Sequence, residues 1–160
     1  MRKLKIYLDT SVISHLDAPD APEKQAETLQ LWEEIKAGEY EVYLSDVVFD
    51  ELENNSDNKK ALLVNYLADI NYQRININNE IREYADELIK LNILKEKHIA
   101  DCLHIGSAVI HECNMILSWN FKHIVRIKTI NGVKSVNSLL GYREIGIYPP
   151  SMLIEPKGDL

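Results

Sequence analysis

Three acidic side chains from three separate segments are the strongest candidates for chemistry: Asp9, Glu51 and Asp101. Asp9 follows an apolar stretch, KLKIYL at residues 3–8, which predicts a short strand with the carboxylate standing at its end. A hydrogen-bonded turn is the ordinary role of an aspartate in such a place. Two hydroxyl residues follow it, Thr10 and Ser11; one would cap the next helix and the other could assist a water or a phosphate.

The other two acids lie in segments whose patterns predict helices. Val47 and Val48 precede Glu51 by four and three positions, which places this carboxylate on or beside an apolar helix face. An unpaired charge there is costly, although an acid at the solvent-exposed edge of the apolar stripe would give the same pattern. Asp101 lies in the first turns of a helix rich in small and apolar residues, where the helix dipole alone also favours an anion. His104 is three residues further along, and we expect this lone helical histidine to be structural.

Three carboxylates brought together need a counter-charge, because like-charged acids raise each other's pKa. A divalent cation removes that conflict, and an all-oxygen ligand set favours Mg²⁺ or Mn²⁺ over zinc. Such an ion polarises a phosphoryl oxygen, activates water and stabilises the leaving oxygen. The acids therefore predict metal-dependent hydrolysis of a phosphodiester.

The elements that must position these acids alternate between strands and helices. Strands are predicted at residues 3–8, 41–44, 74–77, 115–119 and 145–148, the last as an edge strand. Helices are predicted at residues 12–16, 23–36, 46–54, 57–67, 78–94 and 98–112, with one or two more before Gly141. This alternation predicts an α/β fold with a mainly parallel sheet of four to five strands between helical layers. In such sheets the ligand site lies beyond the carboxyl ends of the strands, which is where Asp9 is expected.

The length of 160 residues predicts one domain, at residues 1–155, followed by a flexible tail at 156–160. No apolar stretch is long enough to span a membrane, and we expect a cytoplasmic protein. Cys102 and Cys113 fall in one predicted helix about 16 Å apart, too far for a disulfide, so reduced thiols are expected. The net charge of −7 argues against a protein that coats DNA, but not against an enzyme that touches few phosphates.

The sequence resembles the PIN-domain nucleases, and in size it resembles their VapC-type branch, the toxin ribonucleases of toxin–antitoxin pairs. The resemblance runs from about residue 3 to residue 124 and rests on the order and separation of four motifs: YLDTS at 7–11, SDVVFDEL at 45–52, IADCLHI at 99–105 and LSWNF at 117–121. It implies a PIN-like three-layer α/β/α fold, cleavage of RNA and a cognate antitoxin as partner. We expect the RNA substrate to be single-stranded. A homodimer is compatible with it.

Carried over by position, the resemblance implies that Asp9, Glu51 and Asp101 bind Mg²⁺ or Mn²⁺, and that Asn120 bridges to the metal or orients water. Members of the family commonly carry a fourth acid three residues after that asparagine, where this chain has His123. We therefore expect one firmly held cation, with His123 either meeting a phosphate or exposed in a loop. Basic residues near the predicted loops would supply further phosphate contacts if they converge: Lys59, Lys60, Lys97, Lys122, Arg126 and Lys128.

Two other functions fit parts of the pattern. A PIN-like fold kept as a binding module for RNA or protein would explain the missing fourth acid. A phosphatase of the haloacid dehalogenase type also begins with an aspartate after the first strand, but it needs a second acid two residues later. This chain has Ser11 there, which disfavours the phosphatase.

Overall fold

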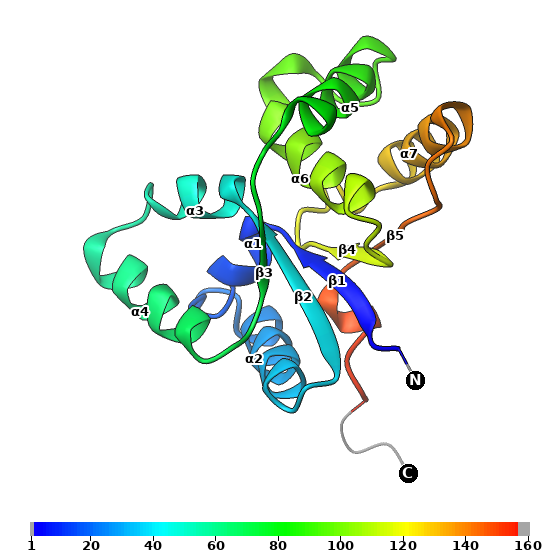
Figure 1. The fold of residues 1–160 in the computed structure, drawn as a ribbon. Helices are drawn as coiled ribbons and strands as arrows, with labels where there is room; N and C mark the ends of the chain where they lie inside the picture. Colours follow the sequence, from blue (N-terminus) through cyan, green and yellow to red (C-terminus); the bar gives the residue numbers. More distant parts are fainter. Residues whose placement is uncertain (1, 157–160) are drawn as a thin grey trace.

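The protein is built on a parallel sheet. The computed structural model describes residues 2–156, and within them five strands run in the spatial order β3-β2-β1-β4-β5, every neighbouring pair parallel (Figure 1). The strands are β1 (Leu4–Leu8), β2 (Tyr40–Ser45), β3 (Gln73–Ile75), β4 (Met115–Leu117) and β5 (Gly146–Tyr148). Because β1 lies at the centre and the chain returns to its other side with β4, the order of the strands reverses between β1 and β4.

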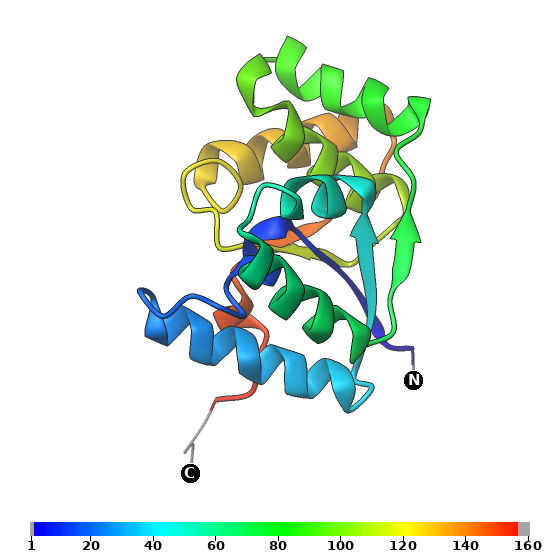
Figure 2. The same ribbon diagram turned by 90° about the vertical axis from the view of Figure 1, so that its left-hand side faces the viewer.

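Helices cover both faces of the sheet, which gives the predicted three-layer α/β/α fold. They are α1 (Thr10–Ser14), α2 (Pro22–Lys36), α3 (Asp46–Leu52), α4 (Asp57–Ala68), α5 (Asn79–Lys90), α6 (Ile99–Ile110) and α7 (Ile127–Leu140), with two 3-10 turns, η1 (Glu96–His98) and η2 (Pro150–Met152). In Figure 2, α2 and α4 lie toward the bottom of the view and α5, α6 and α7 toward the top.

The side chains of β1 alternate between two hydrophobic cores. Ile6 and Leu8 point into the core beneath α1, α2 and α4, whereas Tyr7 points into the core beneath α5, α6 and α7. All three are fully buried. A strand that is buried on both faces carries a continuous apolar run, as the second half of KLKIYL does at residues 6–8.

The strand order reverses between β1 and β4, and parallel α/β proteins usually bind ligands beyond the carboxyl ends of the strands at such a point, which is called the crevice below. At the carboxyl end of β1, the backbone amide of Asp9 donates to the carbonyl of Leu117, the last residue of β4. One residue further, the amide of Ser118 donates to the carbonyl of Tyr148 on β5. The strand ends are thus joined in register, and the side chains of Asp9 and Ser118 stand side by side at the crevice.

Several boundaries differ from the sequence-based prediction. The helix predicted over residues 78–94 ends at Lys90, because Asn92 adopts a left-handed conformation (φ 64°) that stops it. Leu91, which lies inside the predicted helix but beyond the observed one, is 47% exposed. The C-terminal end of α7 is as predicted: Gly141 takes a left-handed φ of 81°, which the absence of a side chain makes inexpensive.

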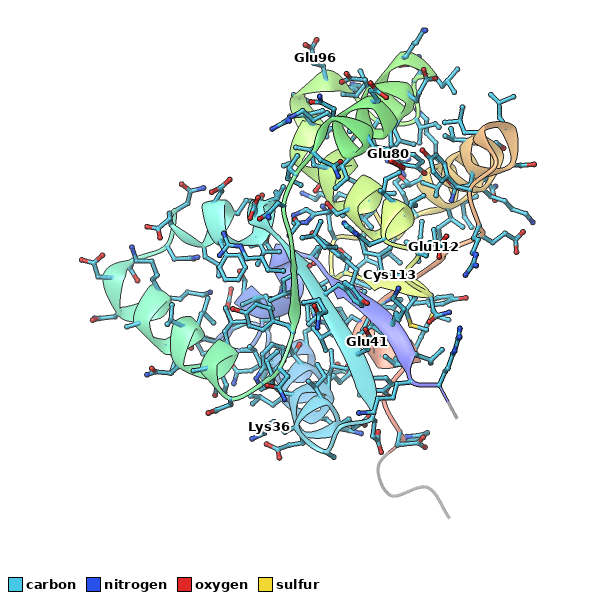
Figure 3. All side chains as sticks on the ribbon, viewed as in Figure 1. Lys36, Glu41, Glu80, Glu96, Glu112 and Cys113 are labelled. Carbon is cyan, nitrogen blue, oxygen red and sulfur yellow. The ribbon has the colours of Figure 1, made fainter. Side chains whose placement is uncertain are left out.

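The two cysteines are buried, free thiols, as predicted, but they do not share one helix, because α6 ends at Ile110 and Cys113 follows it. Burial raises the pKa of each thiol to about 12, so both are inert at neutral pH. Figure 3 shows Cys113 near Glu41 of β2, on the amino-terminal half of the sheet and away from the crevice.

The C-terminal segment crosses the sheet and packs on α2. η2 contacts α2, and the amide of Glu155 donates to the Glu34 carboxylate. The predicted tail at residues 156–160 lies outside the described residues except for Pro156. Within residues 2–156, no helix has both the length and the apolarity that a membrane crossing requires.

Candidate active site

Asp9 is a buried carboxylate held in a fixed orientation. It is 3% exposed and is the N-cap of α1, with Oδ1 accepting from the Ser11 hydroxyl at 2.5 Å and from the Val12 amide at 3.2 Å. Oδ2 accepts from the hydroxyl of Ser118 at 2.5 Å. Burial raises the pKa of Asp9, against the opposing effects of His104 and of these hydroxyl donors. Ser118, which the sequence did not single out, is thus one of the groups that orient the central acid.

Glu51 is the second carboxylate and is held from two sides. It lies on α3, whose N-cap Ser45 places it one and a half turns into the helix beside α1 and α6. Its Oε1 accepts from the Thr10 hydroxyl at 2.6 Å and lies 2.7 Å from Nε2 of His104. Burial alone would raise the pKa of Glu51, but the hydrogen bond and charge of His104 outweigh it, so the pKa is lowered. Glu51 is therefore the acid most firmly held as an anion.

His104 connects Glu51 to the interior of the protein. The ring is 2% exposed, and its Nδ1 lies 2.6 Å from the hydroxyl of Tyr7, which in turn lies 2.7 Å from Oγ of Ser45. Burial raises the pKa of Tyr7, so the phenol stays neutral and can relay hydrogen bonds. The structural role expected for this histidine is correct, but its partners are an acid of the candidate site and a tyrosine of β1, which no local pattern indicated.

Asp101 is the acid most affected by the other two. It lies in the first turn of α6, and burial together with repulsion from Asp9 and Glu51 raises its pKa to about 6, although His104 and His98 act in the opposite direction. None of the side-chain hydrogen bonds formed among residues 2–156 involves this carboxylate. The contacts that link the segments of the three acids run through neighbours: Thr10, which follows Asp9, donates to Glu51, and His104, which lies on the same helix as Asp101, is 2.7 Å from Glu51.

Asn120 lies in the loop after β4, next to Ser118. Its Oδ1 accepts from the backbone amides of Lys122 and His123, so the side chain carbonyl shapes the loop. The Nδ2 group makes no hydrogen bond within the described residues and is the part of Asn120 that could meet water or a phosphate. The exposed ring of Phe121 follows it.

His123 is neither directed at the acids nor freely exposed. Its ring stacks on that of His98, with centroids 3.7 Å apart. Burial and the positive charges of His98 and Arg126 lower the pKa of His123, so the ring is neutral at neutral pH. The position that would carry a fourth acid thus faces a group of basic side chains.

The fit of a divalent cation rests on the chemistry of the donors. In the described part of the chain, no three His, Cys, Asp or Glu side chains form a ready-made metal-binding group. The chemistry of the three acids still suits a hard ion, because their ligand atoms are all oxygens and the carboxylate of Asp101 has no side-chain hydrogen bond within the described residues.

Comparison with known proteins places the chain in a family. Residues 6–124 match the PIN domain family, and the chain belongs to it. The fold is similar to that of VapC20 from Mycobacterium tuberculosis, described as a toxin that cleaves the sarcin-ricin loop, with a TM-score of 0.58, 16% identity, and 88% of this chain and 98% of that chain covered. It is also similar to VapBC2 from Rickettsia felis, solved with a promoter DNA fragment, with a TM-score of 0.53, 14% identity, and 90% and 97% covered. No curated protein sequence matches the chain.

Proposed function

We propose that the protein is a metal-dependent endoribonuclease, the toxin component of a toxin–antitoxin pair. The observation that carries the proposal is the set of contacts that joins the segments of the three acids: Thr10, next to Asp9, donates to Glu51, and His104, on the helix that carries Asp101, lies 2.7 Å from Glu51. Membership in the PIN domain family and the likeness in fold to VapC20 and VapBC2 support it. An antitoxin partner, and a homodimer of this chain, belong to the same proposal.

In this proposal Asp9, Glu51 and Asp101 hold Mg²⁺ or Mn²⁺. The ion would supply positive charge to the phosphoryl oxygens and activate water for attack. The chain's own hydroxyls fix the geometry: Ser11 and Ser118 orient Asp9, and Thr10 orients Glu51. Because these side chains are oriented before substrate arrives, little reorganisation is needed during the reaction.

Substrate contacts are assigned to polar groups around the crevice. Thr10 and Ser11 lie at the start of α1, and Asn120 offers its free amide group to a water or a phosphate. Lys122, exposed in the same loop, and His123 would meet the RNA backbone. Few phosphate contacts suffice for a short single-stranded substrate, which is consistent with a chain of net charge −7.

The test is cleavage of single-stranded RNA by purified protein with Mn²⁺, with and without a chelator. Wild type should cut only without the chelator, and Asp9→Asn, Glu51→Gln and Asp101→Asn should each lose activity while keeping the fold. Asp50→Asn is the matched control, because this acid directly precedes Glu51 on α3 but is exposed to solvent. Equal loss in Asp50→Asn, or cleavage that survives the chelator, would contradict the proposal.

A binding module for RNA or protein is the second candidate. His123 in place of a fourth acid, and the engagement of Asp9 and Glu51 by protein groups, favour it. Under this alternative, metal-loaded wild type binds single-stranded RNA but leaves it intact, whatever its sequence or structure.

A further inference from the structure

A hollow lined with basic side chains adjoins the carboxylates. It has a volume of about 220 Å³ and lies between the segment that joins α5 to α6 and the loop that joins β4 to α7. Its floor includes Ile93 and Leu94. Its charged and titratable lining is entirely basic: Lys95, Lys97, His98, His123, Arg126 and Lys128.

Within the described residues, no ion pair neutralises the lysines or the arginine of this hollow. No acidic side chain lines it, and the salt bridges formed among residues 2–156 include none of its lysines, nor Arg126. Arg126 uses Nη1 to donate to the carbonyl of Lys122, which fixes the guanidinium without removing its charge. Glu96, the acid between Lys95 and Lys97, lines a different hollow with Asp86 and points away from the body of the molecule (Figure 3). Concentrated, unpaired positive charge in an acidic protein indicates an anionic ligand.

Two histidines connect the hollow to the crevice. His98 is the N-cap of α6, whose first turn holds Asp101. The backbone amide of His123 donates to Oδ1 of Asn120, whose own amide donates to Ser118, the residue that donates to Asp9. Their rings stack with centroids 3.7 Å apart, and both line the hollow. An anion in the hollow would therefore lie beside the two segments that carry Asp101 and Asn120.

We propose that this hollow binds a backbone phosphate of single-stranded RNA adjacent to the scissile phosphate. The inference rests on the proposed function and names how that substrate is held. RNA is favoured over an acidic peptide because the hollow adjoins the crevice, where a continuous phosphate backbone would be drawn across it. Phosphate contacts of this kind position a strand without reading its sequence.

The stacked histidine rings are more rigid than the lysines, so a phosphate in the hollow would meet flexible ammonium groups next to a fixed aromatic pair. Phe121, exposed two residues before His123, offers an aromatic face to a neighbouring base.

The experiment measures binding of a fluorescent single-stranded RNA oligonucleotide in a chelating buffer, where no cleavage occurs, as a function of salt. The double variant Lys97→Gln/Arg126→Gln should weaken RNA binding about tenfold. It should also reduce the slope of log affinity against log salt by about 0.7, which is the value expected for the loss of one phosphate contact on a single strand. A second variant, Lys95→Gln with Lys128→Gln, should do the same. The control, Lys90→Gln with Lys134→Gln, removes the same charge from exposed positions outside the hollow and should leave the slope unchanged.

Two further readouts separate this inference from the proposed function. With Mn²⁺, the hollow variants should raise KM for RNA and leave kcat and metal-induced thermal stabilisation within about twofold of wild type. If neither wild type nor any variant cleaves RNA, but only the hollow variants lose RNA affinity, the phosphate site is supported and the proposed nuclease function is contradicted. The inference would be overturned if both hollow variants bound RNA with the affinity and salt slope of wild type. If those variants kept their RNA binding but lost binding to polyglutamate, the hollow would be assigned to an acidic protein partner instead.

Discussion

The carboxylate crevice and the basic hollow adjoin each other but are built in opposite ways. In the crevice, Asp9 and His104 are almost fully buried and each carries several hydrogen bonds of 2.5–3.3 Å. In the hollow, Lys95, Lys97 and Lys128 are exposed and form no ion pair with described residues. A buried charge needs hydrogen-bond partners within the protein, whereas an exposed charge is solvated by water until a ligand binds. The difference predicts large, specific effects in the crevice and small, salt-dependent effects in the hollow.

The largest effect should follow removal of an acid from the crevice. Mg²⁺ or Mn²⁺ at a hundred times its Kd should stabilise wild type by about 2.7 kcal/mol through mass action. Asp9→Asn should lose that gain, and its RNA cleavage should fall by at least about a thousandfold, the scale expected for one member of a catalytic unit. Thermal melting with and without the cation checks the first result. Undiminished metal stabilisation in Asp9→Asn would place the cation elsewhere.

The pH dependence of stability should report on Asp101. Its pKa in the folded protein is raised to about 6 from an ordinary 3.8, so the folded state binds this proton more tightly than the unfolded state does. Between these values the metal-free protein therefore loses stability as the pH rises, by up to about 3 kcal/mol in total. Urea unfolding at pH 4.5 and 7 should show this loss in wild type and not in Asp101→Asn, which mimics the protonated acid. A wild type that gains stability over this range, relative to the variant, would contradict the assignment.

A smaller effect should follow from cutting the buried hydrogen-bond chain behind Glu51. Tyr7→Phe removes the hydroxyl between His104 and Ser45 and leaves both without that partner, at a cost of about 1–3 kcal/mol. Tyr43→Phe is the matched control: its hydroxyl donates to Glu41 at the surface, and its loss should cost less than about 0.5 kcal/mol. Equal free energies of unfolding for the two variants would show that the buried chain adds no stability.

The smallest effect should come from His123, which faces the hollow. His123→Ala should change the affinity for Mg²⁺ little, because a neutral imidazole is a poor ligand for this ion. His123→Asp, which adds a carboxylate at the fourth-acid position, should tighten metal binding, and RNA-free wild type should hold one cation firmly. Titration calorimetry on the three proteins measures this. Two tight sites in wild type, or weaker binding in His123→Asp, would refute the prediction.

The acids themselves could be found from local pattern because burial leaves a trace in the sequence. Asp9 ends an apolar run, and Glu51 and Asp101 interrupt apolar helix faces, so each stands out as a charge where none is expected. Strand and helix order followed from the same patterns, with errors at boundaries such as Lys90, where the backbone conformation of Asn92 overrides the periodicity.

The gathering of the basic side chains in the hollow could not be read from the sequence. In the sequence, Lys59 and Lys60 were as good candidates for phosphate contacts as Lys97 and Lys128. Only the latter two line the hollow, whereas Lys60 pairs with Glu53, the C-cap of α3. A cluster assembled from separate segments depends on how those segments pack, which charge counting along the chain does not encode.

The sequence by itself determined the order of the elements, the positions of the three acids and the family to which the chain belongs, because hydrophobic periodicity and motif spacing are local properties. The tertiary structure alone decided that His104 reaches Glu51 from another helix, that Ser118 reaches Asp9 across 109 residues, and that the basic side chains gather beside them. The physical reason is the parallel sheet: it brings the carboxyl ends of β1 and β4 together, and with them groups that are distant along the chain.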